Sequence, residues 1–194
     1  MRTSHLAVVS LFGVGALAAC GSNGGSPGPV AVAANLPFAV ASEVAFSGFV
    51  NGTFGAQSLT VYIGNRPEVT CATAPSLSIG NTRLASLDLL TLDVVNENGV
   101  VSPGTYNIVP LGSGSGASAL YSASTATCAP ANGPSLQAES GTITLTQLSS
   151  ASVAGTYRVT LGTQVFSDSF DVAICDAGDT LSGVDAGPPL VCQQ

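Results

Sequence analysis

The sequence predicts an all-β fold: an antiparallel β-sandwich, or a closed β-barrel, of about eight strands, with a helix only in an N-terminal signal peptide. Apolar and polar residues alternate with a period of two along much of the chain. Gly, Pro, Asn and Ser separate the alternating stretches, as turns do in all-β domains. Beyond the N-terminal segment, no stretch has an unambiguous helical period.

The first 19 residues have the composition of an export signal. Arg2 supplies one positive charge, an apolar stretch covers 6–16, and the sequence Leu-Ala-Ala-Cys follows at 17–20. The apolar stretch is shorter than the about 20 residues that cross a bilayer, which indicates a cleaved signal peptide and not a spanning helix.

The Leu-Ala-Ala-Cys sequence resembles a bacterial lipobox, and the resemblance implies that Cys20 becomes the acylated N-terminus of a lipoprotein. The alternative is cleavage after Ala18, which releases a secreted protein. Because the chain has five cysteines, acylating Cys20 leaves an even number for disulfides and favours the lipoprotein. Gly21 replaces the Asp typical of inner-membrane retention. We therefore expect a lipid anchor in the outer membrane, at its periplasmic or cell-surface face.

The rest of the chain divides into a tether and one domain. Residues 20–35 are rich in Gly, Ser and Pro and carry no charge, which predicts a flexible tether. Residues 36–194 are enough chain for one domain, and we expect a single β domain with a disulfide-stapled C-terminal tail.

The C-terminal part of the domain alternates most clearly. Residues 142–146 alternate Thr with Ile and Leu, and 153–161 place Val, Gly, Tyr, Val and Leu on one face. Residues 166–174 complete a predicted meander of three strands, since Gly162-Thr163 suits a two-residue hairpin loop.

Earlier stretches predict further strands. Residues 40–50 and 59–63 predict a hairpin with an Asn-Gly turn between them. Residues 84–95 fit a helix or a strand, and the turn residues that follow favour the strand. Shorter strands are expected around 106–108 and 119–121.

The cysteines other than Cys20 are expected to form disulfides in an oxidising compartment. Their positions favour Cys71–Cys128 with Cys175–Cys192, and two other connectivities stay open. The second bridge would staple the C-terminal tail. Close Cys-x-x-Cys pairs are absent from the sequence, which argues against a zinc site.

Four short stretches carry a family resemblance. They are Pro-Gly-Thr-Tyr at 103–106, Ser-Gly-Thr-Ile-Thr-Leu-Thr at 140–146, Val-Ala-Gly-Thr-Tyr at 153–157 and Ser-Phe-Asp-Val-Ala-Ile-Cys at 169–175. The chain thereby resembles uncharacterised outer-membrane-type lipoproteins of gliding, predatory Gram-negative bacteria, over about two fifths of its length. It departs from them at Asp168, where a Gly commonly precedes Ser-Phe. The resemblance implies no catalytic residue.

Composition excludes several kinds of chemistry. The chain has no Lys and no Trp, and its one His, His5, lies in the expected signal peptide. Catalytic triads with His, His-ligated zinc, Lys Schiff bases and P-loops are therefore excluded. After removal of residues 1–19, eleven acidic residues and three Arg leave a net charge of −8, which excludes nucleic acid as a partner.

Five aspartates gather toward the C-terminus: Asp168, Asp171, Asp176, Asp179 and Asp185. The sequence Asp-Thr-Leu-Ser-Gly that begins at Asp179 resembles a fragment of a calcium-binding nonapeptide repeat. A single fragment without the Gly-Gly-x-Gly lead favours a solvated acidic loop, so no cofactor is expected. Asp176, Asp179 and Asp185 stay weak candidates for binding calcium.

A hydrolase that relies on carboxylates needs two of them together. Glu43, Glu68, Glu97 and Glu139 stand in separate loop or strand-edge contexts. We therefore expect a non-catalytic binding or structural module of the cell envelope, with a protein or glycan partner that the sequence does not identify. The alternatives are a calcium-supported surface adhesin and a carboxylate-based hydrolase.

Overall fold

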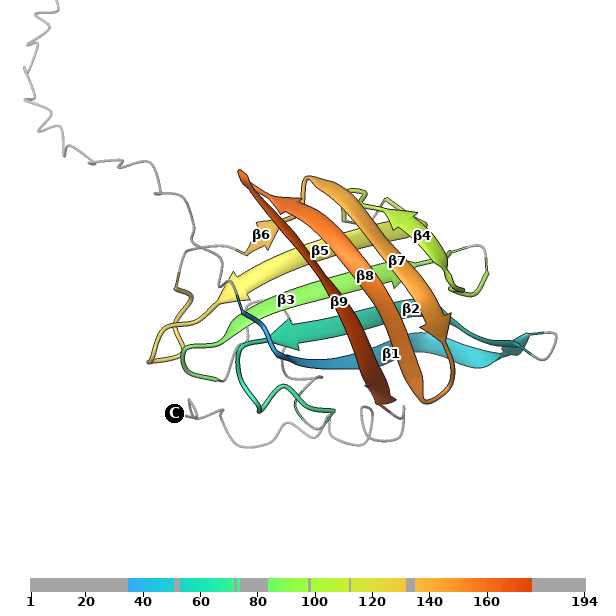
Figure 1. Cartoon of the computed structure of the whole chain (residues 1–194), viewed down its shortest axis with the longest axis horizontal. Helices are drawn as coiled ribbons and strands as arrows, with labels where there is room; N and C mark the ends of the chain where they lie inside the picture. Colours follow the sequence, from blue (N-terminus) through green and yellow to red (C-terminus); the bar gives the residue numbers. More distant parts are fainter. Residues whose placement is uncertain are drawn as a thin grey trace, which may run out of the picture.

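The computed structural model describes residues 35–50, 53–71, 73, 84–97, 99–111, 113–131 and 135–175. Within these ranges the chain is all-β, with nine strands and no helix (Figure 1). The strands are β1 (Phe38–Val50), β2 (Thr53–Gly64), β3 (Asp88–Val95), β4 (Gly104–Asn107), β5 (Gly116–Ala123), β6 (Leu136–Gln137), β7 (Ser140–Leu148), β8 (Ser152–Leu161) and β9 (Gln164–Cys175). The predicted all-β class is confirmed for this part of the chain.

Several expected features lie outside the described residues. They are the signal peptide over 1–19, the acylated Cys20, the tether up to residue 34, and Asp176, Asp179, Asp185 and Cys192. Within the described ranges, no helix has the length and apolar character that crossing a membrane requires.

The described strands form one curled, mixed sheet in the order β4-β7-β8-β9-β1-β2-β3-β5-β6. Neighbours pair antiparallel except β1 and β9, which pair parallel at Ala41 with Ile174 and at Ser42 with Cys175. The expectation of a purely antiparallel sheet is therefore wrong at this junction. The physical reason is that the chain keeps its direction between β6 and β7, so that β1 and β9 point the same way.

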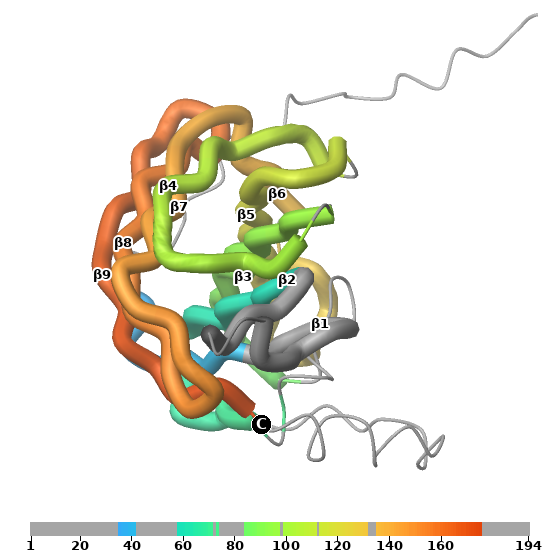
Figure 2. Tube along the Cα trace, turned by 90° about the vertical axis from the view of Figure 1, so that its right-hand side faces the viewer, coloured from blue at the N-terminus to red at the C-terminus, as the bar shows by residue number. Residues whose placement is uncertain are grey.

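One continuous run of chain, 136–148, links the two halves of the sheet. Its first part, β6, pairs with β5, and the Ala138 amide donates to the Ala119 carbonyl at 2.8 Å. The next amide, of Glu139, donates to the Thr160 carbonyl at 3.0 Å, and β7 continues along β8. As a result β7, β8 and β9 cross over β1, β2, β3 and β5 as a second layer (Figure 1), and the sheet is strongly curled when seen from the side (Figure 2).

The hydrophobic core lies between these layers. Alternate residues of β8 are buried, as their spacing predicts: Val153, Gly155, Tyr157, Val159 and Leu161. From the facing layer, Leu90, Leu92 and Val94 of β3 are each at most 1% exposed, which confirms a strand and not a helix here. Each such side chain contributes roughly 1.5–3 kcal/mol by leaving water.

The Pro-Gly-Thr-Tyr turn at 103–106 is closed by its own tyrosine. The Tyr106 hydroxyl donates to the Ser102 carbonyl at 2.6 Å and accepts from the Ser102 amide at 3.0 Å. These two bonds satisfy the backbone amide and carbonyl of Ser102, just before β4, which pairs with β7.

Gly141 of β7 lies directly against the backbone of β8. Its φ is +134°, and a Cβ at this position would lie 2.1 Å from the Arg158 carbonyl oxygen and 2.7 Å from the Val159 Cα. Both contacts are with backbone, so no side-chain rotation relieves them, and only glycine fits.

We predict that Gly141→Ala lowers the free energy of unfolding by more than about 2 kcal/mol, because β7 must shift away from β8. Gly104→Ala is the matched control. Its nearest neighbour is the Ser102 carbonyl oxygen at 3.9 Å, and we expect a change within about 0.5 kcal/mol. Urea unfolding of both variants measures the difference, and equal losses would contradict the close approach at Gly141.

Candidate functional site

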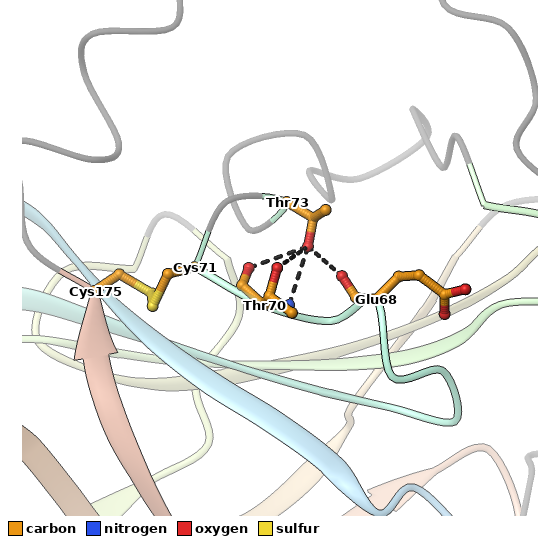
Figure 3. The surroundings of a disulfide bond; sticks show 5 residues. All are labelled: Glu68, Thr70, Cys71, Thr73 and Cys175. Carbon is orange, nitrogen blue, oxygen red and sulfur yellow. Dashed lines mark hydrogen bonds between the residues drawn. A yellow bond between two sulfur atoms is a disulfide. The ribbon is translucent and has the colours of Figure 1, made fainter.

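A disulfide joins Cys71, in the loop after β2, to Cys175 at the end of β9 (Figure 3). The two Cα atoms lie 5.2 Å apart, and the cysteines are 104 positions apart in sequence. Beside it, the Thr73 hydroxyl accepts from the Thr70 amide at 3.0 Å and donates to the Glu68 carbonyl. The loop therefore has its own hydrogen bonds as well as a covalent link to β9.

The expected pairing of Cys71 with Cys128, and of Cys175 with Cys192, is wrong. The parallel junction of β9 with β1 brings Cys175 to the loop that follows β2, whereas Cys128 lies in the turn after β5. Cys128 is disulfide-bonded too. Its φ is +58°, a left-handed conformation that a residue other than Gly adopts at a cost.

The glutamates considered for hydrolysis take separate places among the described residues. Glu68 pairs with Arg66 at 2.8 Å, and the hydrogen bonds from that guanidinium lower the pKa of Glu68 to about 2. Glu97 and Glu139 are exposed, and only the backbone of Glu43 is described. Among the described side chains, no three His, Cys, Asp or Glu come together to hold a metal ion.

A cavity of about 260 Å³ lies on the outer face of β2, β3 and β5, and we call it the Asp93 cavity. Leu92 and Val94 face the core, so Asp93 between them faces outward. It stands in one row with Thr60 of β2 and Ser118 of β5, its cross-strand partners. The cavity is lined by Ser58, Thr60, Asp93, Val95, Val109, Pro110, Leu111, Gly114, Gly116, Ala117 and Ser118.

Asp93 is partly buried and is held by two hydroxyl groups. Thr60 Oγ1 donates to its Oδ1 at 2.7 Å, and Ser118 Oγ donates to its Oδ2 at 3.5 Å. Burial raises the pKa of Asp93, and the two hydroxyl hydrogen bonds offset only part of that shift. Of the described residues, no arginine bonds to this carboxyl.

The loop between β4 and β5 forms the apolar side of the Asp93 cavity. The Val109 amide donates to the Ala117 carbonyl at 2.8 Å, which holds the loop against β5. A Cβ on Gly116 would lie 2.7 Å from Val109 Cγ2, so this approach requires glycine. A Cβ on Gly114 would lie 3.1 Å from Glu97 Oε2, which places a second carboxylate beside the loop.

A second cavity, of about 280 Å³, lies where β9 and the residues before Ala41 diverge. We call it the β9 cleft; it is lined by Leu36, Pro37, Ala39, Ile63, Tyr157 and residues 168–172. The pKa of Tyr157 is raised to about 12, mainly by burial and to a smaller extent by the negative charge of Asp168. Asp168 and Asp171 both line this cleft, but they are three residues apart on one strand and project from its opposite faces.

Asp93 was not among the residues that the sequence singles out. The sequence feature that could have pointed to Asp93 is its position as an acidic residue in a mostly apolar strand. Such a residue ordinarily faces solvent. The acidic residues that the sequence did single out are those of the C-terminal cluster, of which Asp168 and Asp171 fall within the described residues and line the β9 cleft.

Comparison of the chain with protein-family models, with curated proteins and with solved structures finds no match.

For the disulfide, we predict that the double variant Cys71→Ser/Cys175→Ser loses about 2–5 kcal/mol of unfolding free energy, because the loop it closes is long. Urea unfolding measures the loss. In the unchanged protein, peptide mapping without reductant should yield a peptide containing Cys71 joined to one containing Cys175. A Cys71–Cys128 peptide would contradict the assignment.

The Asp93 carboxyl should make stability depend on pH. Because its pKa is raised in the folded state above the ordinary value of 3.8, the folded protein binds more protons between these two pKa values. Its contribution to stability is therefore present below the unfolded pKa and is lost as pH rises through the folded pKa.

We predict that Asp93→Asn, which keeps the shape and removes the charge, gains stability relative to the unchanged protein as pH rises from 3 to about 7. Urea unfolding at a series of pH values measures this gain. Asp171→Asn, at an exposed position of β9, controls for the loss of one negative charge. A gain that is the same at every pH, or equal in both variants, would contradict the assignment.

Proposed function

We propose that this protein is a lipid-anchored, non-catalytic binding module of the outer membrane, with its ligand in the Asp93 cavity. The anchor is proposed from the lipobox-like sequence that ends at Cys20. The observation that carries the binding function is a concave site in which a partly buried carboxyl, two buried hydroxyl groups and an apolar loop converge. Pockets with a few polar groups on apolar walls are the usual form of ligand sites.

We further propose that the domain is a closed β-barrel and not a sandwich. Two contacts support closure. Residues 136–148 bond to β5 at their start and to β8 along their length. Beside them, Ile108 bridges to Ala117 of β5, and its amide donates to the Gly141 carbonyl at 2.9 Å. A barrel exposes no long free edge to other strands, which suits a protein held at high local density on a membrane.

The arrangement of carboxyl groups supports binding over hydrolysis. Hydrolysis of a glycosidic bond takes two carboxyl groups that face each other across the substrate. Of the residues that line the Asp93 cavity, one is acidic. In the β9 cleft, Asp168 and Asp171 project from opposite faces of their strand.

Acylation at Cys20 is tested by growing cells with a labelled fatty acid. We expect the unchanged protein to carry the label and to enter the membrane fraction, and Cys20→Ala to lose both properties. Cys128→Ser, another single cysteine replacement, should keep the label. Label retained by Cys20→Ala, or absent from the unchanged protein, would refute the anchor.

The binding function is tested with amide NMR spectra of the purified chain and a set of small amines, acids, sugars and alcohols. Saturable shifts that cluster on residues lining the Asp93 cavity are the expected result. If no solute perturbs those residues, the Asp93 cavity is not the ligand site and this part of the proposal fails.

A further inference from the structure

The Asp93 cavity has a negative charge for which the described part of the chain provides no cation. The described residues include two arginines, and neither pairs with Asp93. Arg66 bonds to Glu68 and to the Ala85 carbonyl, and Arg158 is exposed on β8 in the other layer. The whole chain contains no Lys. Buried carboxylates in proteins are normally paired with a cation or become protonated. Within the described residues ionised Asp93 therefore has no cationic partner, and a ligand can supply one.

We propose that the Asp93 cavity binds a small organic ligand through a protonated amino group that pairs with the Asp93 carboxylate. This inference rests on the proposed binding function and specifies its ligand. From the described residues, Asp93 Oδ2 receives only the long hydrogen bond of 3.5 Å from Ser118, although a carboxylate accepts about four hydrogen bonds in all. An ammonium group carries three N–H donors and supplies both the missing hydrogen bonds and the missing charge.

The apolar part of the site limits the rest of the ligand. Val95, Val109, Pro110 and Leu111 line the cavity and offer carbon atoms but no polar side-chain group. Leu111 is 51% exposed, so a ligand can cover it and remove apolar surface from water. The volume of about 260 Å³ is below the range for drug-sized molecules. An amine with a short hydrocarbon chain matches these dimensions.

A metal ion fits the same site poorly. Calcium takes six to eight oxygen ligands, often from several carboxylates. The lining residues include one acidic side chain, and seven of the eleven are apolar residues or glycine. A neutral sugar could bond to the hydroxyl groups but would leave the charge of Asp93 unpaired. The ammonium group is therefore the cation that this arrangement favours.

Binding of the amine should weaken in acid. The ligand pairs with ionised Asp93, so protonation of Asp93 competes with binding, and affinity falls as pH drops through the pKa of this carboxyl. The residues of β2, β5 and the loop that line the cavity have no titratable side chain. Among the described residues, Glu97 beside Gly114 is a second carboxylate near the site, and its charge would attract the same cation.

Titration of the full processed chain with n-butylammonium chloride, followed by the NMR signal of the Asp93 side-chain carboxyl carbon and by amide signals, tests the proposal. We expect saturable shifts at the cavity, with binding at least about tenfold weaker for 1-butanol, which has the same shape and no charge. Asp93→Asn should weaken butylammonium binding by about tenfold or more, whereas Asp171→Asn should leave it unchanged. Amide spectra establish that each variant is folded.

Other outcomes overturn the proposal in distinguishable ways. If 1-butanol binds as well as butylammonium, the cavity takes apolar solutes, and the binding function stands without the amine. If glucose or calcium shifts the cavity residues and butylammonium does not, the ligand class is wrong but the site is real. If butylammonium binds equally to the Asp93→Asn variant, Asp93 does not hold the ligand. If no solute in the panel binds, the proposed binding function fails as well.

Discussion

The backbone hydrogen bonds of two consecutive residues, Ala138 and Glu139, determine how the two layers of the described sheet are connected. The first amide donates to β5 and the second to β8, so the chain passes from one layer to the other without a turn. Ala138 is 4% exposed, and a buried amide without a partner would cost about 1–3 kcal/mol. Because the chain keeps its direction here, β9 meets β1 in parallel, and one sheet curls around the larger of two hydrophobic clusters.

Local features of this fold could be predicted from the sequence, and long-range ones could not. The alternation of Val153, Tyr157 and Leu161 predicts the buried face of β8, and Gly162 predicts the hairpin that follows. The parallel pairing of β1 with β9 depends on the passage of the chain from one layer to the other near Glu139. No short sequence pattern predicts that passage. The cysteine pairing fails for the same reason, since Cys175 meets Cys71 only through that junction.

The candidate site shows the same division. Alternation correctly places Asp93 on the side away from the core, between Leu92 and Val94. Alternation does not predict that a loop covers this side of the sheet. The loop at Val109 covers it, and it can approach because Gly116 has no side chain. The result is a carboxyl with a raised pKa on a face that sequence patterns treat as solvated. Composition adds that the chain has no lysine to neutralise it.

The Cys71–Cys175 disulfide also governs how the protein responds to force. When the two ends of the chain are pulled apart, the tension passes through this bond and bypasses the 103 residues between the two cysteines. Those residues would otherwise lengthen by roughly 340–370 Å when pulled straight. While the bond is intact, only the chain before Cys71, which includes β1 and β2, and the chain after Cys175 can be extended by such a force, and β3 to β9 cannot be pulled straight.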